Sequence, residues 1–249
     1  MAAHVLAFPW PLQGHINPML HLASALLDAG LRVTFLHTEH NLRRFTRVPP
    51  HHPRLRLVSI PDGLPDHHPR SVGGLMELVE SMRTAGSAAY RALLLRMMES
   101  DDDDAVTCVI TDGVMPFAVS VAEELGVPAL AFRTESACGF LAYLSVPRLL
   151  ELGEKPVPSD EQTNSRFVGA VWRTGLDMKD VWQRAVVERM VREAMESPEI
   201  RASAQSMSRQ LRLDIAQGGS SSSELERLVG LITELSAVKI SSPAPALTC

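Results

Sequence analysis

The sequence predicts an α/β fold, with a doubly wound parallel sheet of five strands followed by a helical C-terminal tail. In residues 1–153, short apolar runs alternate with amphipathic helical patterns, which is the order of βαβ units. These runs are continuously apolar, as in strands that helices cover on both faces. We expect the strand order 3-2-1-4-5 that is usual for such sheets. The predicted strands are His4–Phe8, Arg32–His37, Leu55–Ile60, Val106–Thr111 and Val127–Phe132.

The segments between these strands carry helix start and stop signals. Asn17 is a good N-cap residue and Pro18 suits the first helical position, so the first helix is expected to begin there. Its apolar residues recur at i, i+3, i+4 and i+7, and Gly30 stands where a C′ glycine ends a helix. Further helices are predicted over Asn41–Thr46, Leu75–Glu99, Ala118–Leu125 and Ser136–Leu152.

The character of the chain changes after residue 153. Residues 154–161 are mostly polar and contain two prolines, which is typical of a linker. Beyond it the patterns are helical, and Arg166–Val171 is the single candidate for a strand. We therefore divide the chain into residues 1–153, the linker 154–161, and a helical part over 162–249.

Two helices of the tail have clear start signals. One follows Ser197-Pro198, and another is predicted to begin at the capping box Ser223-x-x-Glu226. The apolar residues predicted to face inward are Ile200, Ala204, Met207, Leu211 and Ile215 on the first of these helices, and Leu225, Leu228, Val229, Ile232 and Leu235 on the second.

Composition narrows the class of protein. The chain has 249 residues, of which 45% are hydrophobic and 21% charged, as in ordinary globular proteins. The net charge of −5 gives no electrostatic reason to expect nucleic acid or an anionic membrane as a partner. No apolar run approaches the roughly 20 residues of a membrane span. Cys108, Cys138 and Cys249 are not closely paired and no basic leader precedes them, so we expect reduced thiols, no metal site and a cytoplasmic protein.

Two residues distant in sequence are candidates for one site. Ligands bind doubly wound sheets at the carboxyl ends of the strands, where the strand order reverses. His15 lies in the loop after the first strand, and Asp112 ends the fourth. A carboxylate beside an imidazole fixes its tautomer and raises its basicity, so the pair could deprotonate a hydroxyl. The alternative is that His15 is only a helix-entry residue and that Asp112 caps the helix beginning at Pro116.

Other common sites have weaker support. The first loop contains Gly14 but no GxGxxG fingerprint, and neither a phosphate-binding GxxxxGK[ST] loop nor a GxSxG elbow occurs in the sequence. The pairs His51-His52 and His67-His68 lack carboxylate or cysteine partners at ligand spacing, so a metal site there is not expected.

Several segments together resemble a known family, the plant UDP-glycosyltransferases of glycosyltransferase family 1. The resemblance covers nearly all of the chain and is most specific in the first loop. It is carried by Phe8–Leu20 (FPWPLQGHINPML), Phe35–Glu39, Asp112 within Ile110–Asp112, Thr134 within Phe132–Ala137, Asp160–Gly169 (DEQTNSRFVG) and Val171–Asp177.

The resemblance implies roles for individual residues. His15 would be the general base that takes the proton of the acceptor hydroxyl, and with Gly14 it would contact the acceptor. Asp112 would hydrogen-bond His15 and balance its charge. The acceptor oxygen would then displace UDP from the anomeric carbon of a UDP-sugar with inversion, without any cofactor. Thr134 matches a hydroxyl that contacts the sugar.

The resemblance also implies a sugar contact in the tail. Asp160 matches the acidic member of an Asp-Gln pair that holds the sugar hydroxyls in the family. Glu161 stands where the family has glutamine, so an amide donor is replaced by a carboxylate.

The donor half of the family pattern is mostly missing. The family's nucleotide-sugar signature, with a Trp-Ala-Pro-Gln start and a His-Cys-Gly-Trp-Asn-Ser core, does not occur in the sequence. The implied fold is therefore the Rossmann-like acceptor half of a GT-B fold (1–153), a junction (154–161) and a helical remnant of the donor half (162–249).

The implied function is transfer of a sugar, glucose in the first instance, to a hydroxyl of a small acceptor such as a flavonoid or phenolic. The alternative is a catalytically dead form that binds acceptor or associates with an intact relative. The implied partners are the acceptor, a UDP-sugar if a donor site survives, and a second copy through the tail helices.

Overall fold

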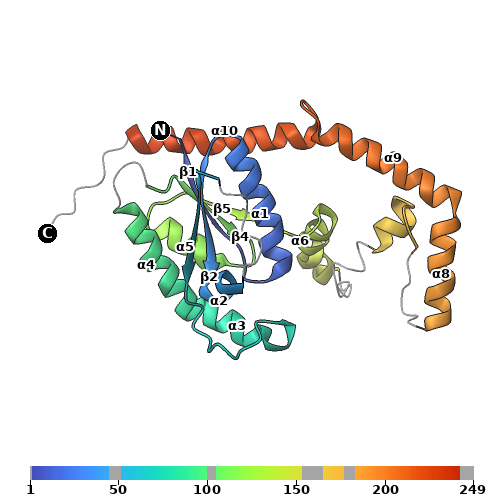
Figure 1. Cartoon of the computed structure of the whole chain (residues 1–249), viewed down its shortest axis with the longest axis horizontal. Coiled ribbons are helices and arrows are strands. Elements are labelled where there is room, and N and C mark those ends of the chain that lie inside the picture. The colour runs from blue at the N-terminus through green and yellow to red at the C-terminus, as the bar shows by residue number, and fades with distance from the viewer. Residues whose placement is uncertain (1, 45–51, 100–104, 153–164, 177–182, 242–249) are drawn as a thin grey trace. The chain divides into compact units, whose positions relative to one another are not determined.

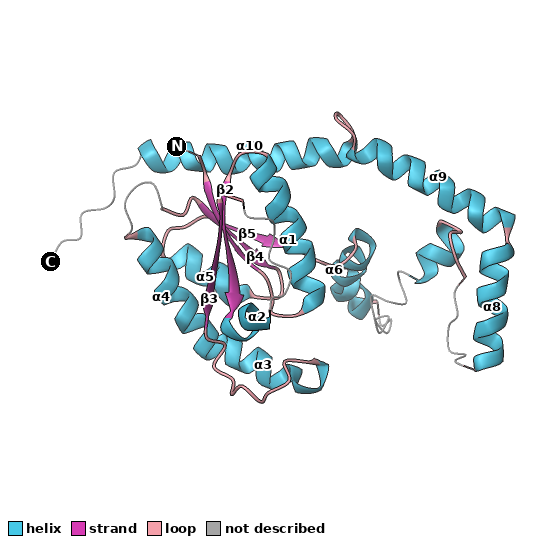
Figure 2. Ribbon diagram, in the orientation of Figure 1, coloured by secondary structure: helices cyan, strands magenta, loops and turns pink. Residues whose placement is uncertain are grey.

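A five-stranded parallel sheet organises the first part of the chain (Figures 1 and 2). The strand order is β3-β2-β1-β4-β5, and every neighbouring pair is parallel, which confirms the predicted doubly wound sheet. The computed structural model describes residues 2–44, 52–99, 105–152, 165–176 and 183–241. The strands are β1 (His4–Phe8), β2 (Arg32–Thr38), β3 (Leu55–Ile60), β4 (Cys108–Asp112) and β5 (Ala129–Phe132).

The chain divides into two compact units. The first consists of Met1–Thr134 together with Arg227–Cys249, and the second of Glu135–Glu226. The first unit contains the whole sheet. The division proposed from the sequence, at 153 and 161, stays a prediction.

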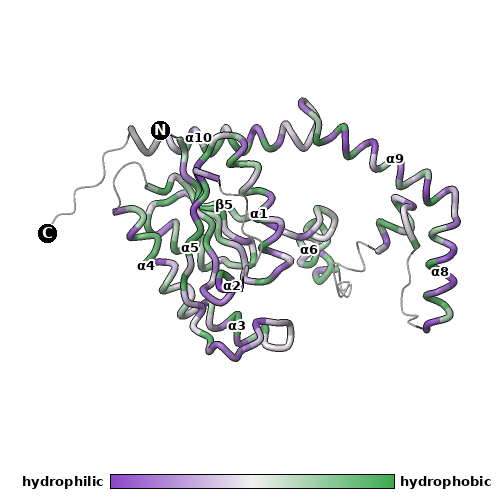
Figure 3. The backbone as a smooth tube through the Cα atoms, in the orientation of Figure 1, coloured by the Kyte–Doolittle hydropathy of each residue, from purple (hydrophilic) through white to green (hydrophobic). Residues whose placement is uncertain are grey.

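Helices cover both faces of the sheet in the first unit. One face packs against a continuous helical segment and α5, and its core includes Phe8, Leu78, Tyr90 and Val121. That segment comprises α3 (Leu75–Ser81), a π-turn η2 (Met82–Gly86) and α4 (Ser87–Met98), and α5 is Pro116–Glu124. Figure 3 shows the apolar colouring concentrated in this sheet and the helix faces around it. The covered faces explain why the strands read as continuous apolar runs.

The other face is covered by α1 (Gln13–Asp28) and by the C-terminal part of α10 (Ser220–Ser241). Ile232 of α10 is fully buried in the same core cluster as Met19 and Phe35. One turn of the last helix is therefore part of the core of the sheet unit.

The first helix begins earlier than its sequence signals predict. α1 starts at Gln13, with Leu12 as N-cap, and Pro18 lies inside it. Proline has no N–H, so the helix lacks the bond that residue 18 would make to the carbonyl of Gly14. The helix forms regardless, because Ile16 and Met19 are buried against the sheet and tertiary packing outweighs the local signal. This early start places His15 within the first turn.

The predicted stop of α1 is confirmed. Gly30 has a φ of +95°, and the amides of Gly30 and Leu31 donate to the carbonyls of Leu27 and Leu26 at 3.0 Å. This is a Schellman motif, which leads the chain directly into β2.

The predicted helix over Asn41–Thr46 corresponds to α2 (Glu39–Arg44), which directly follows β2, and positions 45 and 46 lie outside the described residues. β5 begins two residues later than predicted. The Val127 amide donates to the Ala122 carbonyl at the end of α5, and Pro128 has no N–H to give to a sheet.

The second unit contains only helices among its described residues. α6 (Ala137–Glu151) is capped by Ser136, whose hydroxyl accepts from the Gly139 amide at 3.1 Å. The strand suggested for Arg166–Val171 is wrong, because residues 167–171 form the π-turn η3. The Trp172 amide donates to the Phe167 carbonyl at 2.7 Å, and the two rings pack at 5.4 Å between centroids. Local backbone and ring contacts outweigh the β-branched composition here.

α8 (Arg184–Glu196) and α9 (Pro198–Ile215) follow, and Ser197 caps α9 as predicted through a bond from the Ile200 amide. The apolar residues expected to face inward on α9 share one side, but they are not buried. Leu211 is 55% and Ile215 70% exposed. No described element covers this side closely enough to exclude water.

α10 begins at Ser220, three residues before the predicted capping box. The Ser223 amide donates to the Gly219 carbonyl at 2.9 Å, an ordinary i to i−4 helical bond. Ser223 therefore lies inside the helix and cannot be its N-cap. No helix within the described residues is long and apolar enough to cross a membrane.

Candidate active site

The candidate site lies where β1 and β4 end side by side. Phe8 and Thr111 are register partners in the two neighbouring strands. Asp112 is the last residue of β4, and the chain after β1 turns through residues 9–12 into α1. The strand order reverses between these two strands, so both segments open at the same edge of the sheet.

His15 and Asp112 meet at this edge. The His15 Nδ1 and Asp112 Oδ2 atoms are 2.8 Å apart. The histidine side chain is 25% exposed and the aspartate only 1%. The buried carboxylate therefore faces a ring that solvent and small molecules can reach.

Backbone amides fix the orientation of the carboxylate. The Val114 amide donates to Asp112 Oδ1 at 3.1 Å, and the Trp10 amide lies 3.4 Å from Oδ2. The Met115 amide donates to the Asp112 carbonyl at 2.9 Å and closes a turn over residues 112–115. These contacts satisfy a buried charge that would otherwise be costly to desolvate.

This geometry defines the tautomer of His15. A carboxylate can only accept, so Nδ1 must carry the hydrogen that points to Asp112. In the neutral ring the lone pair then resides on Nε2, which is the form of imidazole that can take a proton from a hydroxyl.

Thr134 also contacts the histidine. Its Oγ1 lies 3.2 Å from His15 Nδ1, just beyond the end of β5. The hydroxyl oxygen is thus a second partner of the nitrogen that faces Asp112. The resemblance implies a sugar contact for Thr134, and this ring contact was not anticipated.

The other predicted site residues are Gly14, Asp160 and Glu161. Gly14 lies in the first turn of α1, exposed, and a methyl group there would meet nothing within 4 Å. Asp160 and Glu161 lie outside the described residues. The alternative role of Asp112 as a cap is not seen, because the N-cap of α5 is Met115 and no side chain caps that helix.

Gly113 and Arg133 are neighbours of the site that the sequence patterns do not single out. Arg133 Nη1 donates to the Gly113 carbonyl at 3.0 Å, and the Gly113 amide donates to the Phe132 carbonyl at 2.8 Å. The Asp112-Gly113 dipeptide is a turn signal that predicts the bend but not the arginine that packs against it.

A buried ion pair organises the segment after β3. Asp62 and Arg70 are almost fully buried, and Arg70 Nε and Nη2 donate to the carboxylate at 3.0 and 2.9 Å. The other guanidinium hydrogens go to the carbonyls of Leu64, Pro65 and His68. Burial by itself would raise the pKa of Asp62, but hydrogen bonds from Arg70 and the Leu64 amide outweigh it and hold this pKa below its usual value.

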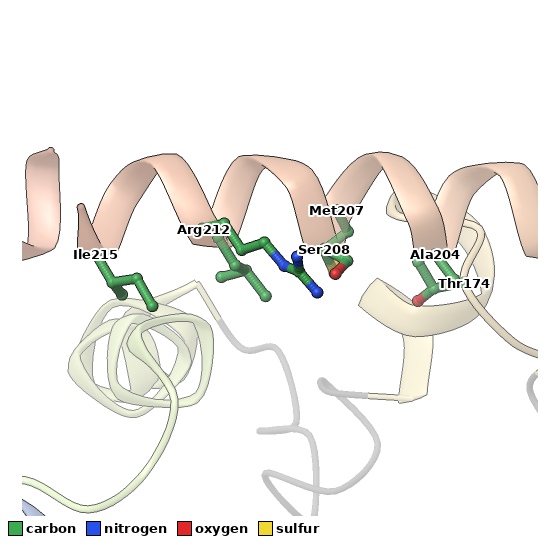
Figure 4. Close-up of a pocket in the computed structure, with 7 residues that line it drawn as sticks. Thr174, Ala204, Met207, Ser208, Arg212 and Ile215 are labelled. Carbon is green, nitrogen blue, oxygen red and sulfur yellow. The ribbon is translucent and has the colours of Figure 1, made fainter.

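A hollow lies in the helical unit, and no carboxylate–histidine pair lines it. It is lined by Thr174 and one side of α9 (Figure 4). Its lining contains no histidine, cysteine or carboxylate, so it offers no group for proton abstraction. The residues that line the hollow are Thr174, Ala204, Met207, Ser208, Leu211, Arg212 and Ile215.

Among the described residues, no cluster of three histidine, cysteine or acidic side chains could hold a metal ion.

Comparison with characterised proteins identifies relatives of this chain. UDP-glycosyltransferase 85A5 of Arabidopsis thaliana is 39% identical over 183 residues, which are 72% of this chain and 38% of that protein. Myricetin 3-O-rhamnoside 1,2-glucosyltransferase UGT709G2 of Crocosmia x crocosmiiflora is 41% identical over 175 residues, or 70% and 37% of the two chains. (R)-mandelonitrile beta-glucosyltransferase of Prunus dulcis is 39% identical over 185 residues. No protein-family model matches the chain.

Solved structures of other proteins are also similar to this chain. Os79 from O. sativa, in a complex with trichothecene, is 27% identical with a TM-score of 0.50, and the likeness covers 80% of this chain and 44% of that one. A structure of Arabidopsis thaliana UGT89C1 gives a TM-score of 0.68 over 93% of this chain at 13% identity, which is a likeness of fold alone.

The sheet and its flanking helices are the N-terminal half of a GT-B glycosyltransferase fold, followed by a helical C-terminal region. More particularly, the chain belongs to the plant UDP-glycosyltransferases. It spans about 38% of the length of the curated relatives that it matches.

Proposed function

We propose that this chain carries the acceptor side of a UDP-glycosyltransferase, and that it takes part in transferring a sugar from a UDP-sugar to a hydroxyl of a small acceptor. The observation that carries this proposal is the 2.8 Å hydrogen bond between His15 and Asp112 at the sheet edge between β1 and β4. Acceptor-side transfer chemistry needs a base of this kind, and the pair combines a reachable imidazole with a buried carboxylate.

The proposed step is a direct displacement. His15 Nε2 takes the proton of the acceptor hydroxyl while the acceptor oxygen forms a bond to the anomeric carbon. The bond from that carbon to the diphosphate breaks, its electrons leave with UDP, and the configuration inverts. Asp112 stabilises the imidazolium that forms, since its carboxylate faces Nδ1 at 2.8 Å.

We also propose roles for individual residues that would contact the sugar or the acceptor. Thr134 is proposed to contact the donor sugar as well as the ring of His15, and Gly14 to line the acceptor beside His15. Asp160 and Glu161 are proposed to hold sugar hydroxyls, with the carboxylate of Glu161 accepting where an amide would also donate.

The relatives support the classes of substrate. These relatives include two glucosyltransferases, one of which is named for a myricetin rhamnoside, and a variant of the rice protein was solved in complex with UDP. We therefore propose glucose as the sugar and a flavonoid or another phenolic as the acceptor. A cytoplasmic location is proposed with them.

The test is a transfer assay on the purified full chain. UDP-glucose is incubated with a panel of flavonols and simple phenols, and products are sought by the mass of one added hexosyl group. Product that depends on His15 supports the proposal. Calorimetric titration with UDP-glucose, UDP and each acceptor accompanies the assay. Acceptor binding without donor binding or product would contradict transfer and support the catalytically dead alternative.

A further inference from the structure

The turn that carries Asp112 is held from the neighbouring strand. Gly113 follows Asp112 in this turn, and its amide donates to the Phe132 carbonyl at 2.8 Å. Its own carbonyl accepts from Arg133 Nη1 at 3.0 Å. Both sides of the Gly113 residue are therefore bonded to the end of β5.

The arginine stem occupies the space beside this glycine. A methyl group on Gly113 would lie 2.2 Å from Arg133 Cδ, and its two next nearest atoms would also belong to Arg133. Gly113 is not needed for a left-handed backbone, because its φ is not positive. It is needed because any side chain would displace the arginine.

The same short segment reaches the histidine. Arg133 is followed directly by Thr134, whose hydroxyl lies 3.2 Å from His15 Nδ1. Phe132, Arg133 and Thr134 therefore contact the turn behind Asp112 on one side and the ring of His15 on the other.

We infer that Arg133 is a positioning residue that sets the hydrogen bond between His15 and Asp112. The carboxylate direction depends on the turn over residues 112–115. Arg133 holds the carbonyl of the Gly113–Val114 peptide, and the N–H of the same peptide donates to Asp112 Oδ1. Loss of the guanidinium lets this peptide rotate and weakens the bond that keeps the hydrogen on Nδ1 of His15. The inference rests on the proposed function, since it adds a residue to the same site.

The test measures the protonation of the His15 ring itself and needs no substrate. Nitrogen NMR of ¹⁵N-histidine-labelled full chain distinguishes a protonated from an unprotonated Nδ1, and exchange of the Nδ1 hydrogen with water reports how firmly it is held. In Arg133→Met, which keeps an unbranched stem but no donor, we expect a mixed tautomer and roughly tenfold faster exchange, as for loss of one ordinary hydrogen bond. Arg133→Lys restores a donor and is expected to recover part of the difference.

A matched control exists in the same chain. Arg54 Nη1 also donates to a glycine carbonyl, that of Gly30, at 3.0 Å. Arg54→Met removes the same kind of contact at another turn, so it is expected to leave the signals of His15 unchanged.

A second variant covers the case in which Arg133→Met does not fold. Gly113→Ala, which forces the arginine away, is expected to change the signals of His15 as Arg133→Met does. In an Arg133→Ala background, Gly113→Ala is expected to add almost nothing, because the clashing stem is gone.

Wild-type signals in both Arg133→Met and Gly113→Ala would overturn the inference. If the wild-type chain transfers sugar while these signals stay unchanged, the inference fails and the proposed function stands. If the signals change as expected but no transfer occurs, the proposed function fails and the positioning role stands.

Discussion

The chemistry of His15 depends on a single buried carboxylate. Asp112 accepts from the ring and from backbone amides, while its charge is shielded from solvent by the end of the sheet. This arrangement fixes which nitrogen of the ring can act as a base. Proton abstraction therefore depends on the tautomer of His15 as much as on its presence.

Replacing Asp112 by asparagine tests this claim. The amide group of Asn can donate to Nδ1, which moves the hydrogen to Nε2 and removes the basic lone pair. We expect Asp112→Asn to lower the transfer rate by about 100-fold to 10,000-fold, the range typical of general-base catalysis, with little loss of acceptor binding. Rate and affinity are measured on the same preparation. A rate within a few-fold of wild type would exclude a tautomer-fixing role for Asp112.

His37 links stability to pH. It is 2% exposed on β2, and burial lowers its pKa from 6.5 to about 4. The folded state therefore disfavours the protonated ring, whereas the unfolded chain takes up the proton near pH 6.5. The free energy of unfolding is therefore highest above pH 6.5 and decreases as the pH falls toward 4. We expect a loss of about 3 kcal/mol over this window, from 1.4 kcal/mol for each unit of pKa difference.

Urea unfolding at pH 7, 5.5 and 4 checks this expectation. His37→Gln should flatten the pH dependence, whereas the exposed His21→Gln should retain the wild-type slope. Equal slopes in wild type and His37→Gln would show that other groups carry the effect. Asp62 does not interfere in the upper part of this window, because its lowered pKa moves its own loss of stability to lower pH.

At the scale of elements, the last helix belongs to the core of the sheet unit. Ile232 is completely buried, and Leu228 and Leu235 pack against the same cluster as α1. The sequence pattern predicts this apolar face, and the structure identifies its neighbours. The side of α9 has an equally good pattern, yet it remains exposed.

Alanine substitutions separate these two faces. We expect Ile232→Ala to lower the free energy of unfolding by about 2–5 kcal/mol, as for other buried isoleucines. Ile215→Ala removes the same atoms from an exposed position and should change it by less than about 0.5 kcal/mol. Both values come from urea unfolding at pH 7. Similar losses in the two variants would mean that α10 does not pack as described.

Three predictions of a helix start or a strand fail for the same physical reason. Asn17, Ser223 and the residues after Arg166 all carry local signals for a start or a strand, and in each case hydrogen bonds or packing elsewhere decide the outcome. Strand order was predictable because βαβ units permit few arrangements. The start of α1 was not, since burial of Ile16 and Met19 outweighs a missing N–H at Pro18.

The same limit applies to the candidate site. Topology alone suggests that His15 and Asp112 meet, because the ends of neighbouring parallel strands share an edge. The contacts of Thr134 and Arg133 depend on side-chain placement after β5, which no sequence pattern encodes.

For the whole molecule, the exposed apolar side of α9 has consequences in solution. Leu211 and Ile215 lie on one side of the helix and line the open hollow of Figure 4. Exposed apolar clusters of this kind promote association. Self-association through the tail helices stays a prediction, and it is separate from the chemistry of the sheet unit.

Sedimentation velocity over a hundredfold range of concentration, on the order of 1 to 100 µM, checks this prediction. We expect the sedimentation coefficient to rise with concentration, and the double variant Leu211→Glu with Ile215→Glu to abolish the rise. Leu213→Glu is the control, since Leu213 is also exposed but does not line the hollow. A coefficient that is constant in the wild type would contradict the prediction.

We propose that His15 is the base of sugar transfer, and a comparison of two histidine variants is the sharpest test of this role. The rate of transfer from UDP-glucose to the best acceptor is measured for His15→Ala and for His21→Ala, an exposed histidine on the same helix. We expect a loss of at least about 100-fold in kcat/KM for His15→Ala and wild-type activity for His21→Ala. A His15→Ala chain that is folded and transfers sugar at the wild-type rate would contradict it.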